Sequence, residues 1–132
     1  MSEARKIKVV LLEPCKTARI TEIDASLEGM QKVVEGYIES FSPFEEQVCI
    51  VCNEEGKING MRPNRSVCGK DGKMIDIIFG TAFICNCNGE NFGSLSDEQA
   101  NRYRKQFQYP EMFLRDGSGI KAVKFNADRD VR

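Results

Sequence analysis

The 132-residue chain contains no histidine and no tryptophan, and its 19 basic and 20 acidic side chains leave a formal net charge of −1. Without histidine there is no Ser-His or Cys-His nucleophile pair, no histidine-ligated metal and no imidazole general base. No other nucleophile–base pair can be assembled from the sequence, so an enzyme that relies on carboxylates, arginines or a cysteine is the less favoured alternative. The small net charge argues against a nucleic-acid coat. We therefore predict a binding protein with no catalytic residue and no cofactor.

Long apolar runs are also missing. The apolar stretch that begins at Ile7 contains Lys8 and stops at Glu13-Pro14, which makes it too short for a signal peptide. No later stretch approaches the roughly 20 apolar residues of a membrane span. These features predict a cytoplasmic protein that does not contact a membrane, and in a reducing cytoplasm its six cysteines remain thiols.

Four of these cysteines have a spacing that suggests a metal site. Two residues separate Cys49 from Cys52, and one residue separates Cys85 from Cys87, so an all-cysteine zinc site is one interpretation. The segment 47–52 has no turn former, however, and its alternation places Cys52 on one face of a strand and Cys49 on the other. We therefore favour burial of these thiols as small apolar side chains, and we predict no metal.

The apolar pattern predicts one α+β domain. Strands are expected at 6–12, 17–23, 37–41, 47–52, 57–61 and 75–87, the first of them central because it is apolar on both faces. One helix is expected to follow an N-cap at Ser26 or Asp24 and to stop at Gly36, and a second is expected to follow the Ser96–Gln99 capping box. The sum is a mixed, mostly antiparallel sheet of five to seven strands with two helices.

Two local patterns bear on the site. Residues 53–57 suit a type I turn with Gly56 in the left-handed conformation, which would join the strands on either side into a hairpin. Gly80 falls inside the long strand 75–87, where glycine is used for a bulge or for the close approach of a ligand. The domain is expected to span residues 1–113, followed by an extension over 114–132 that adds one edge strand at 120–125 before a frayed end.

Five separated blocks, covering roughly residues 6–113, resemble a family of small proteins carried by phages and conjugative elements of Firmicutes. Two shorter blocks lie at 23–27 and 36–39, and the longer ones read NEEGKxxGxxPNR at 53–65, IIxGTxFI at 77–84 and SLSDEQ at 94–99. This family is known only as a domain of unknown function, so the resemblance implies no catalytic residue. It does imply a setting, because small accessory proteins of mobile elements often counter host defence. They do so by sequestering a nucleotide immune signal or by clamping a defence protein directly.

Charge is unevenly distributed along the chain. Residues 22–55 carry nine acids and one base, a net −8, whereas residues 57–73 carry five bases and one acid, a net +4. This asymmetry indicates a partner, or else two solvated faces that attract one another within the fold. In the basic segment, Pro63 stiffens a bend between Arg62 and Arg65, which suits two guanidiniums that hold a phosphate while Asn64 contacts a base or ribose. The alternative is a structural corner, in which Asn64 caps a turn and the arginines pair with acids of 22–55.

We therefore predict a pocket, at or between the subunits of a homo-oligomer, that sequesters a nucleotide-derived immune signal. The ligand-binding residues of this hypothesis are Arg62, Asn64, Arg65, Gly80, Thr81, Asn53, Lys57 and Tyr37. The alternative function is that of an inhibitor that binds a host defence protein through the acidic 22–55 surface. In either case the expected location is the cytoplasm of a bacterial host, with no nucleic-acid or membrane partner.

Overall fold

An antiparallel sheet of six strands forms the centre of the molecule in the computed structural model, which describes residues 5–89 and 91–126. The strand order is β2-β1-β7-β4-β3, with β8 paired to β7, while β5–β6 and β9–β10 form two separate ribbons. These pairings confirm the predicted single α+β domain with a mostly antiparallel sheet and two helices. The elements are, in chain order, β1 (Lys6–Leu12), β2 (Arg19–Asp24), α1 (Leu27–Val34), β3 (Ile38–Phe41), β4 (Val48–Asn53), β5 (Pro63–Cys68), β6 (Met74–Phe79), β7 (Ala82–Asn88), β8 (Asn91–Gly93), α2 (Asp97–Gln106), β9 (Glu111–Asp116) and β10 (Gly119–Lys124).

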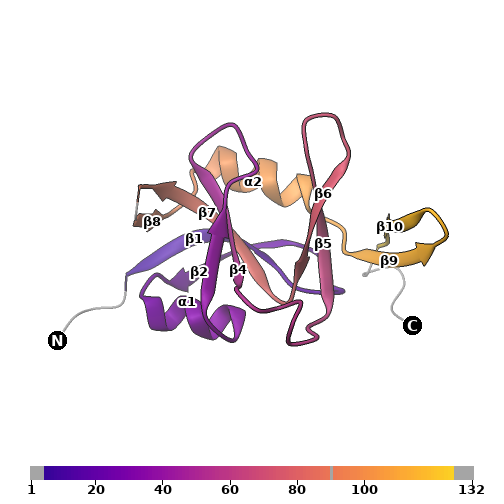
Figure 1. Cartoon of the computed structure of the whole chain (residues 1–132). Coiled ribbons are helices and arrows are strands. Elements are labelled where there is room, and N and C mark those ends of the chain that lie inside the picture. The colour runs from indigo at the N-terminus through magenta and orange to yellow at the C-terminus, as the bar shows by residue number, and fades with distance from the viewer. Residues whose placement is uncertain (1–4, 90, 127–132) are drawn as a thin grey trace.

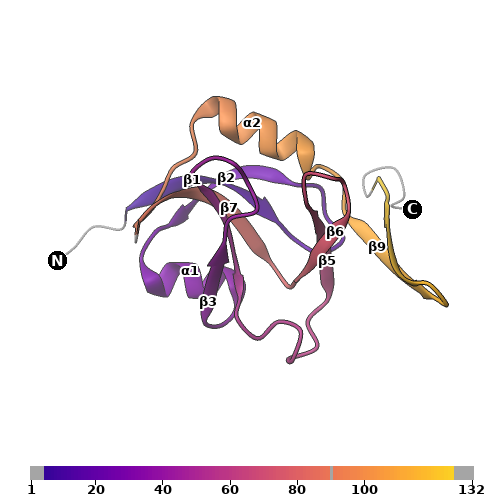
Figure 2. The ribbon, with the colours of Figure 1, turned by 45° about the horizontal axis from the view of Figure 1, so that its top comes forward.

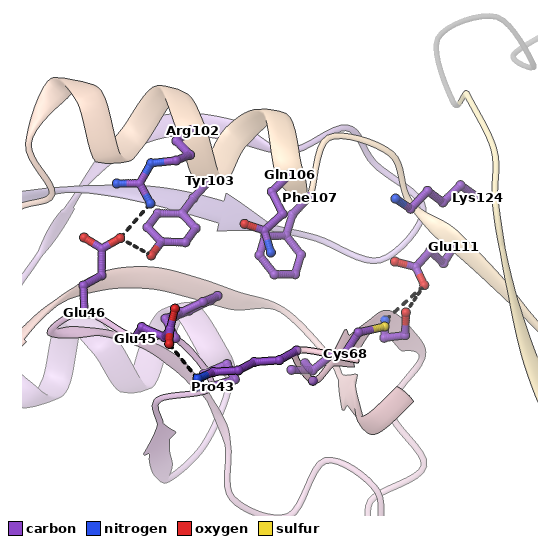
Figure 3. A pocket seen from close by; sticks show the side chains of 15 residues that line it. Pro43, Glu45, Glu46, Cys68, Arg102, Tyr103, Gln106, Phe107, Glu111 and Lys124 are labelled. Carbon is purple, nitrogen blue, oxygen red and sulfur yellow. Dashed lines mark hydrogen bonds and ion pairs between the residues drawn. The ribbon is translucent and has the colours of Figure 1, made fainter. Parts of the chain in front are cut away.

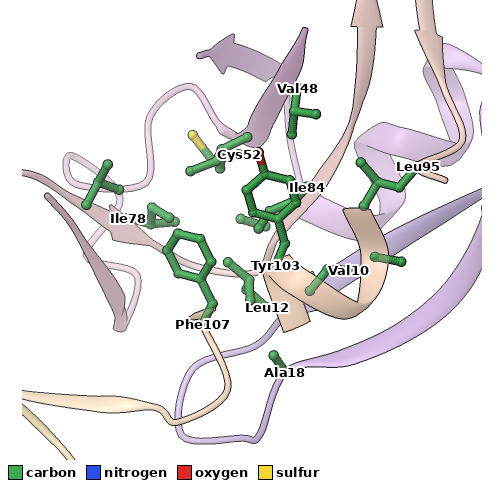
Figure 4. Close-up of a cluster of buried hydrophobic side chains, with 14 residues drawn as sticks. Val10, Leu12, Ala18, Val48, Cys52, Ile78, Ile84, Leu95, Tyr103 and Phe107 are labelled. Atoms are coloured by element: carbon green, nitrogen blue, oxygen red, sulfur yellow. The ribbon is translucent and has the colours of Figure 1, made fainter. Parts of the chain in front are cut away.

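The central sheet lies between the two helices, with α1 on one face and α2 on the other (Figure 1 and Figure 2). Successive side chains of a strand point to opposite faces, so Val9 of β1 packs in the core under α1 and Val10 packs in the core under α2. The core under α2, drawn in Figure 4, also receives Val67 and Ile78 from the β5–β6 ribbon. The ribbon and α2 therefore cover the same face. Because β1 lies between β2 and β7, the prediction of a central first strand is confirmed.

Both helices begin where the capping signals placed them. Ser26 Oγ accepts a hydrogen bond from Gly29 N at 2.9 Å, and Ser96 Oγ accepts one from Gln99 N at 3.1 Å, with the reciprocal bond of a capping box. The first helix ends one residue earlier than predicted, because Glu35 rather than Gly36 takes the left-handed conformation, with φ of 63°.

The prediction of one long strand over 75–87 is wrong. Gly80 has φ of +81° and bends the chain between β6 and β7, which belong to different sheets. A Cβ at this position would lie 2.7 Å from Met61 Sδ, so the backbone conformation and the close approach both favour glycine. The apolar alternation continues through the bend, and for this reason the pattern resembled a single strand.

The predicted hairpin over 47–61 is also wrong. The neighbours of β4 are β3 and β7, and residues 54–60 form successive turns without a returning strand. The side chain of Asn53 does accept a hydrogen bond from Glu55 N at 2.7 Å, but the left-handed glycine of this segment is Gly60, with φ of 70°, and not Gly56. Gly56 instead lies against the main chain of Phe79, where a Cβ would be 2.7 Å from the carbonyl oxygen.

The C-terminal strands pair with each other. The strand predicted at 120–125 is present as β10, but its partner is β9 and it adds nothing to the central sheet. The domain boundary expected at residue 113 falls inside β9, and the frayed end predicted for the last residues lies outside the described ranges. No described helix has both the length and the hydropathy that a transmembrane helix needs.

Candidate functional site

Asn64 and Arg65 are fully buried, and their polar groups are taken by the protein itself. Arg65 donates through Nε to the carbonyl oxygen of Phe107 at 3.0 Å, through Nη2 to that of Lys16 at 2.8 Å, and through Nη1 to Asn64 Oδ1 at 2.8 Å. Neither side chain has an exposed group with which to contact a phosphate or a base. The structure therefore corrects their predicted ligand role to that of a structural corner, in which the partners of Arg65 are carbonyls and not the acids of 22–55.

Three further predicted residues lie at the same corner. Gly80 N donates to Arg62 O at 2.8 Å, and Asn64 Nδ2 donates to Gly80 O at 2.8 Å, so the backbone of the bend is used within the fold. The side chain of Arg62 is exposed and donates to Cys15 Sγ at 3.3 Å. Thr81 follows the bend directly and is half-buried. None of these residues lines either cleft described below.

The remaining predicted residues lie elsewhere. Asn53 is buried, and its amide donates to the last carbonyls of α1 at 3.0 and 3.2 Å, which satisfies the end of that helix. Lys57 is exposed and pairs with Asp76 at 2.9 Å. Tyr37 is 69% exposed. The eight predicted ligand residues are thus distributed over a buried corner, a helix end and a surface turn, and among them Asn53 and Lys57 line one common cleft, the second of the two described below.

Alternation along β4 separates the cysteines as predicted. Cys52 packs in the core under α2, whereas Cys49 packs under α1 with its Sγ 3.9 Å from that of Cys85. Burial raises the pKa of Cys52 to about 12, and the contact with Cys85 together with burial raises the pKa of Cys49. Within residues 5–89 and 91–126, no group of three or more cysteine, aspartate or glutamate side chains is placed to hold a metal ion.

A cleft of about 490 Å³ opens between α2, the loop at 43–46 and the outer end of the β5–β6 ribbon (Figure 3). Its walls hold a cluster of rings, in which the centroid of Phe44 lies 4.7 Å from that of Tyr103 and 6.2 Å from that of Phe107. The ends of β9 and β10 close the far side. The lining residues are Pro43, Phe44, Glu45, Glu46, Ser66, Val67, Cys68, Gly69, Lys70, Arg102, Tyr103, Gln106, Phe107, Glu111 and Lys124.

Glu46 is the hydrogen-bonded centre of one wall. Its Oε2 accepts from Arg102 Nη1 at 2.6 Å and from the Tyr103 hydroxyl at 2.7 Å, and its Oε1 accepts from Gln99 Nε2 at 2.7 Å. These donors, Arg102 first, lower the pKa of Glu46 to about 2, while burial and the Glu46 carboxylate raise the pKa of Tyr103 to about 12. Both groups therefore keep one protonation state near neutral pH, and the cluster fastens the loop at 43–46 to α2.

Cations from three separate segments surround the cleft, namely Lys70, Arg102 and Lys124. Lys70 pairs with Glu45 at 2.6 Å, but the two side chains are 82% and 81% exposed, so the pair contributes little and exchanges readily with other ions. Lys124 forms no ion pair with any residue of 5–89 or 91–126. Figure 3 shows it beside Glu111, whose carboxylate accepts hydrogen bonds from the main-chain N and the hydroxyl of Ser66.

Sequence reasoning missed this cleft, because the segments 43–46, 66–70, 102–107 and 111–124 meet only in the folded chain. The one usable signal was the opposite charge of the segments 22–55 and 57–73. Glu45 belongs to the acidic segment and Lys70 to the basic one, and the two side chains form an ion pair at this cleft.

A second cleft, of about 410 Å³, lies between β3–β4 and β6 and is acidic. Four carboxylates line it, and Lys57 is the single cation among the described lining residues. That lysine is already paired with Asp76, whereas Glu39, Glu54 and Glu55 form no ion pair with any described residue. This cleft therefore suits a cationic group and disfavours a phosphate.

Fold and clefts together define a small α+β domain whose sheet is covered on both faces and whose surface holds a cleft of ligand size. The chain belongs to the DUF3846 family, a domain of unknown function, whose model matches residues 7–108. The expected membership of a small family of unknown function is thereby confirmed. Comparisons with curated proteins and with solved structures gave no match. The matched residues run from β1 to the end of α2 and exclude the β9–β10 ribbon.

Proposed function

We propose that this chain binds a small nucleotide-derived anion in the cleft between α2, the loop at 43–46 and the β5–β6 ribbon, and sequesters it without chemical change. One observation carries the proposal: the half-buried ring of Phe44, backed by the buried rings of Tyr103 and Phe107, and cations from three segments converge at a single cleft of about 490 Å³. That volume is in the range of small-molecule sites, aromatic rings stack against bases, and cations hold phosphates.

The cations differ in how freely they can engage a phosphate. Lys124 has no ion pair to give up among the described residues, and Lys70 gives up one that is largely solvated. Arg102, by contrast, donates from Nη1 to Glu46 Oε2 at 2.6 Å, and its Cζ lies 5.0 Å from the centroid of the Tyr103 ring. We therefore assign phosphate contacts to the two lysines and the shaping of the wall to Arg102.

The Glu46 wall of the cleft is suited to binding without catalysis. A general acid or base works best when its pKa lies near the operating pH. At the wall of the cleft, the pKa of Glu46 is about 2 and that of Tyr103 about 12, so neither group exchanges a proton readily near neutrality. Binding without turnover requires no such group.

The biological setting of the proposal comes from the family resemblance. In that setting the chain is an accessory protein of a phage or conjugative element, and it acts in the bacterial cytoplasm on a nucleotide signal of host defence. Sequestration benefits from a preformed site, because ordering costs are then low. The hydrogen bonds of Glu46 and Glu111 hold two walls of the cleft in place and support this role.

Thermal unfolding with a panel of cyclic dinucleotides, cyclic trinucleotides and cyclic ADP-ribose isomers tests the proposal, with inorganic phosphate as the control for charge. A ligand present at about one hundred times its Kd stabilises the fold by about 2.7 kcal/mol, which is a shift of several degrees. Lys124→Gln should then weaken binding about tenfold through loss of a charge-assisted contact. Lys105→Gln changes an exposed α2 residue outside the lining and should leave binding unchanged.

A panel without a shift contradicts the proposal for these classes of compound. Equal losses in the Lys124 and Lys105 variants would show that binding follows overall charge and not the cleft. If inorganic phosphate shifted the melting temperature as much as the nucleotides did, then the base would contribute nothing to binding.

A protein partner is the second candidate, and the unpaired carboxylates of the second cleft favour it. An inhibitor of a host defence protein that used this surface would bind a basic region of its target. Charge reversal at Glu54 and Glu55 would then abolish co-purification of the target from host lysate. The same variant should retain nucleotide binding if the first cleft is the functional one.

A further inference from the structure

Strand β6 runs along the second cleft with one edge unpaired. Among the described residues it pairs with β5 alone, so no strand lies beside its other edge. Four consecutive residues of β6, from Asp76 to Phe79, line the cleft. Successive side chains of a strand point to opposite faces, so a cleft that touches all four follows the edge of the strand and not one face. The cleft therefore gives access to the main chain of β6.

The main-chain N of Ile77 points to this edge. It donates to the carboxylate of Asp76 at 2.8 Å, and the N of Ser66, its partner in register on β5, donates to the carboxylate of Glu111 at 3.1 Å. Both donors are thus bonded to side chains, as in the antiparallel pairs whose N–H groups face away from each other. The Asp76 side chain therefore occupies the place at which a further strand would bond to Ile77.

The cleft beside this edge is acidic, and part of its lining is apolar. Its charged lining residues in the described part of the chain are four acids and one base, a net −3, namely Glu39, Glu54, Glu55, Asp76 and Lys57. Its apolar lining includes the half-buried rings of Phe41 and Phe79, together with Ile58, which is 81% exposed. The cleft is thus complementary to a cationic group with an apolar stem.

Lys57 shows how an ammonium group is held there. Its Nζ lies 2.9 Å from Asp76 Oδ1 and 5.8 Å from the centroid of the Phe79 ring. The side chains of Lys57 and Asp76 are 62% and 44% exposed, so their ion pair is solvated and exchanges readily. A cation from another molecule can take the same position, with three further carboxylates nearby in the cleft.

We infer that a basic segment of a partner protein, in extended conformation, adds an antiparallel strand to the unpaired edge of β6 and places its cations in the second cleft. In this mode of recognition main-chain hydrogen bonds supply affinity, and pockets for alternate side chains supply specificity. β6 already belongs to an antiparallel ribbon, and antiparallel pairing is slightly the more stable kind.

The alternation of β6 gives the pattern of the segment. Asp76 shares a face with Ile78, which packs in the same core as Cys52, the cross-strand partner of Glu39. Ile77 is on the other face with Ile75, which is 61% exposed. Since side chains that lie opposite each other share a face, lysine or arginine belongs beside Asp76 and apolar residues belong beside Ile75 and Ile77. The segment therefore alternates basic and apolar residues.

Other occupants fit this cleft less well. A nucleic acid or a phosphate is repelled by its charge, and pairing of two β6 edges would bring two sets of carboxylates together. The described acids are not placed to hold a metal ion. A polyamine matches the charge but cannot bond to the edge of a strand. The inference rests on the second candidate function, a protein partner, and is independent of the nucleotide cleft.

Isothermal titration calorimetry of the full chain tests the inference, with an acetylated and amidated peptide that alternates valine and lysine three times. The wild type should bind it at low ionic strength. Because Ile77 N faces outward, the valine opposite Ile77 turns its own amide toward β6. N-methylation of the valine amides should weaken binding at least about tenfold, and N-methylation of the lysine amides should leave binding unchanged.

The matched protein variants change charge equally. Glu54→Gln with Glu55→Gln should weaken peptide binding about fivefold, because two carboxylates of the cleft lose their charge. Glu22→Gln with Glu98→Gln is the control, since both side chains are exposed and lie outside the cleft. Circular dichroism verifies that both proteins are folded, and spermidine provides the same charge as the peptide without a backbone.

Four results would overturn the inference. They are a parent peptide that does not bind, two methylated peptides that bind equally, equal losses in the two double variants, and spermidine that binds as tightly as the peptide. The role in defence is tested separately, by capture of a target from host lysate. Peptide binding with the predicted pattern but no captured target would refute the inhibitor function and support the strand addition.

Discussion

The guanidinium of Arg65 donates to the main-chain carbonyl of Phe107 at 3.0 Å, across 42 residues of sequence. The same side chain reaches the carbonyl oxygens of Lys16 at 2.8 Å and Glu13 at 3.3 Å. One buried cation thus joins β5, the β1–β2 connection and the end of α2. Burial lowers the pKa of Arg65 to about 10, which still leaves it charged at neutral pH. Peptide carbonyls solvate this charge where a carboxylate would be expected.

Arg65→Lys should therefore destabilise the fold by about 2–4 kcal/mol, because an ammonium cannot reproduce the fork of donors and leaves buried carbonyls without partners. The measurement is the free energy of unfolding from chemical denaturation. Arg62→Lys, three residues away and exposed, is the control and should cost less than about 0.5 kcal/mol. Equal stability of the two variants would contradict the structural role of Arg65.

Gly80→Ala tests the bend between β6 and β7. Gly80 and Gly72 have φ of 81° and 80°, but a Cβ at Gly80 would lie 2.7 Å from Met61 Sδ, whereas one at Gly72 would meet nothing within 4 Å. Gly72→Ala should cost about 1 kcal/mol for the left-handed backbone. Gly80→Ala should cost more, because Met61 must also move. If both variants lost the same free energy of unfolding in denaturation experiments, then the Met61 side chain would move aside without an energetic cost.

Periodicity was enough to predict the fold class, the central position of β1, both helix starts and the separation of Cys49 from Cys52. These features follow from local alternation and capping, which the linear sequence contains. The bend at Gly80 was not predicted, because apolar residues continue at every second position on both sides of it. The long strand and the hairpin over 47–61 failed for a related reason, since turn residues do not reveal which strands they join.

The candidate binding site was predicted at the wrong place for a different reason. Arg65 and Asn64 have the residue types of a phosphate site, and only the tertiary structure shows that they are fully buried with their donors in use. The cleft at α2, in turn, depends on four segments that no local pattern connects. Chemistry-bearing residues in a sequence therefore predict a site only when their exposure can also be predicted.

The cysteines should divide into fast and slow groups on alkylation. Cys15 and Cys68 are exposed, whereas Cys49, Cys52 and Cys85 are buried. The reactive species is the thiolate, and the raised pKa values of Cys49 and Cys52 disfavour it further. Mass spectrometry after brief treatment of the native protein with iodoacetamide should find the label on Cys15 and Cys68 first. Early label on the buried thiols would contradict the packing of β4 and β7.

The loop at 43–46 should lose its attachment to α2 in acid. The hydrogen bonds to Arg102, Tyr103 and Gln99 lower the pKa of Glu46 from 4.5 to about 2. Since the folded-state pKa is the lower one, the stabilisation is fully present above about pH 4.5 and is lost as the pH falls toward 2. The free energy of unfolding of the wild type should therefore exceed that of Glu46→Gln near neutral pH, and the difference should shrink over that range.

Glu45→Gln is the matched control for this pH dependence. The carboxylate of Glu45 is adjacent in sequence and pairs with Lys70, but it is 81% exposed, so its loss should change stability by less than about 0.5 kcal/mol. Tyr103→Phe removes one donor to Glu46 and should give an intermediate loss of about 1 kcal/mol. If the Glu46 and Glu45 variants showed the same profile between pH 2 and 7, then the hydrogen bonds at Glu46 would not hold the wall of the cleft, and the preformed site that sequestration needs would lose its main support.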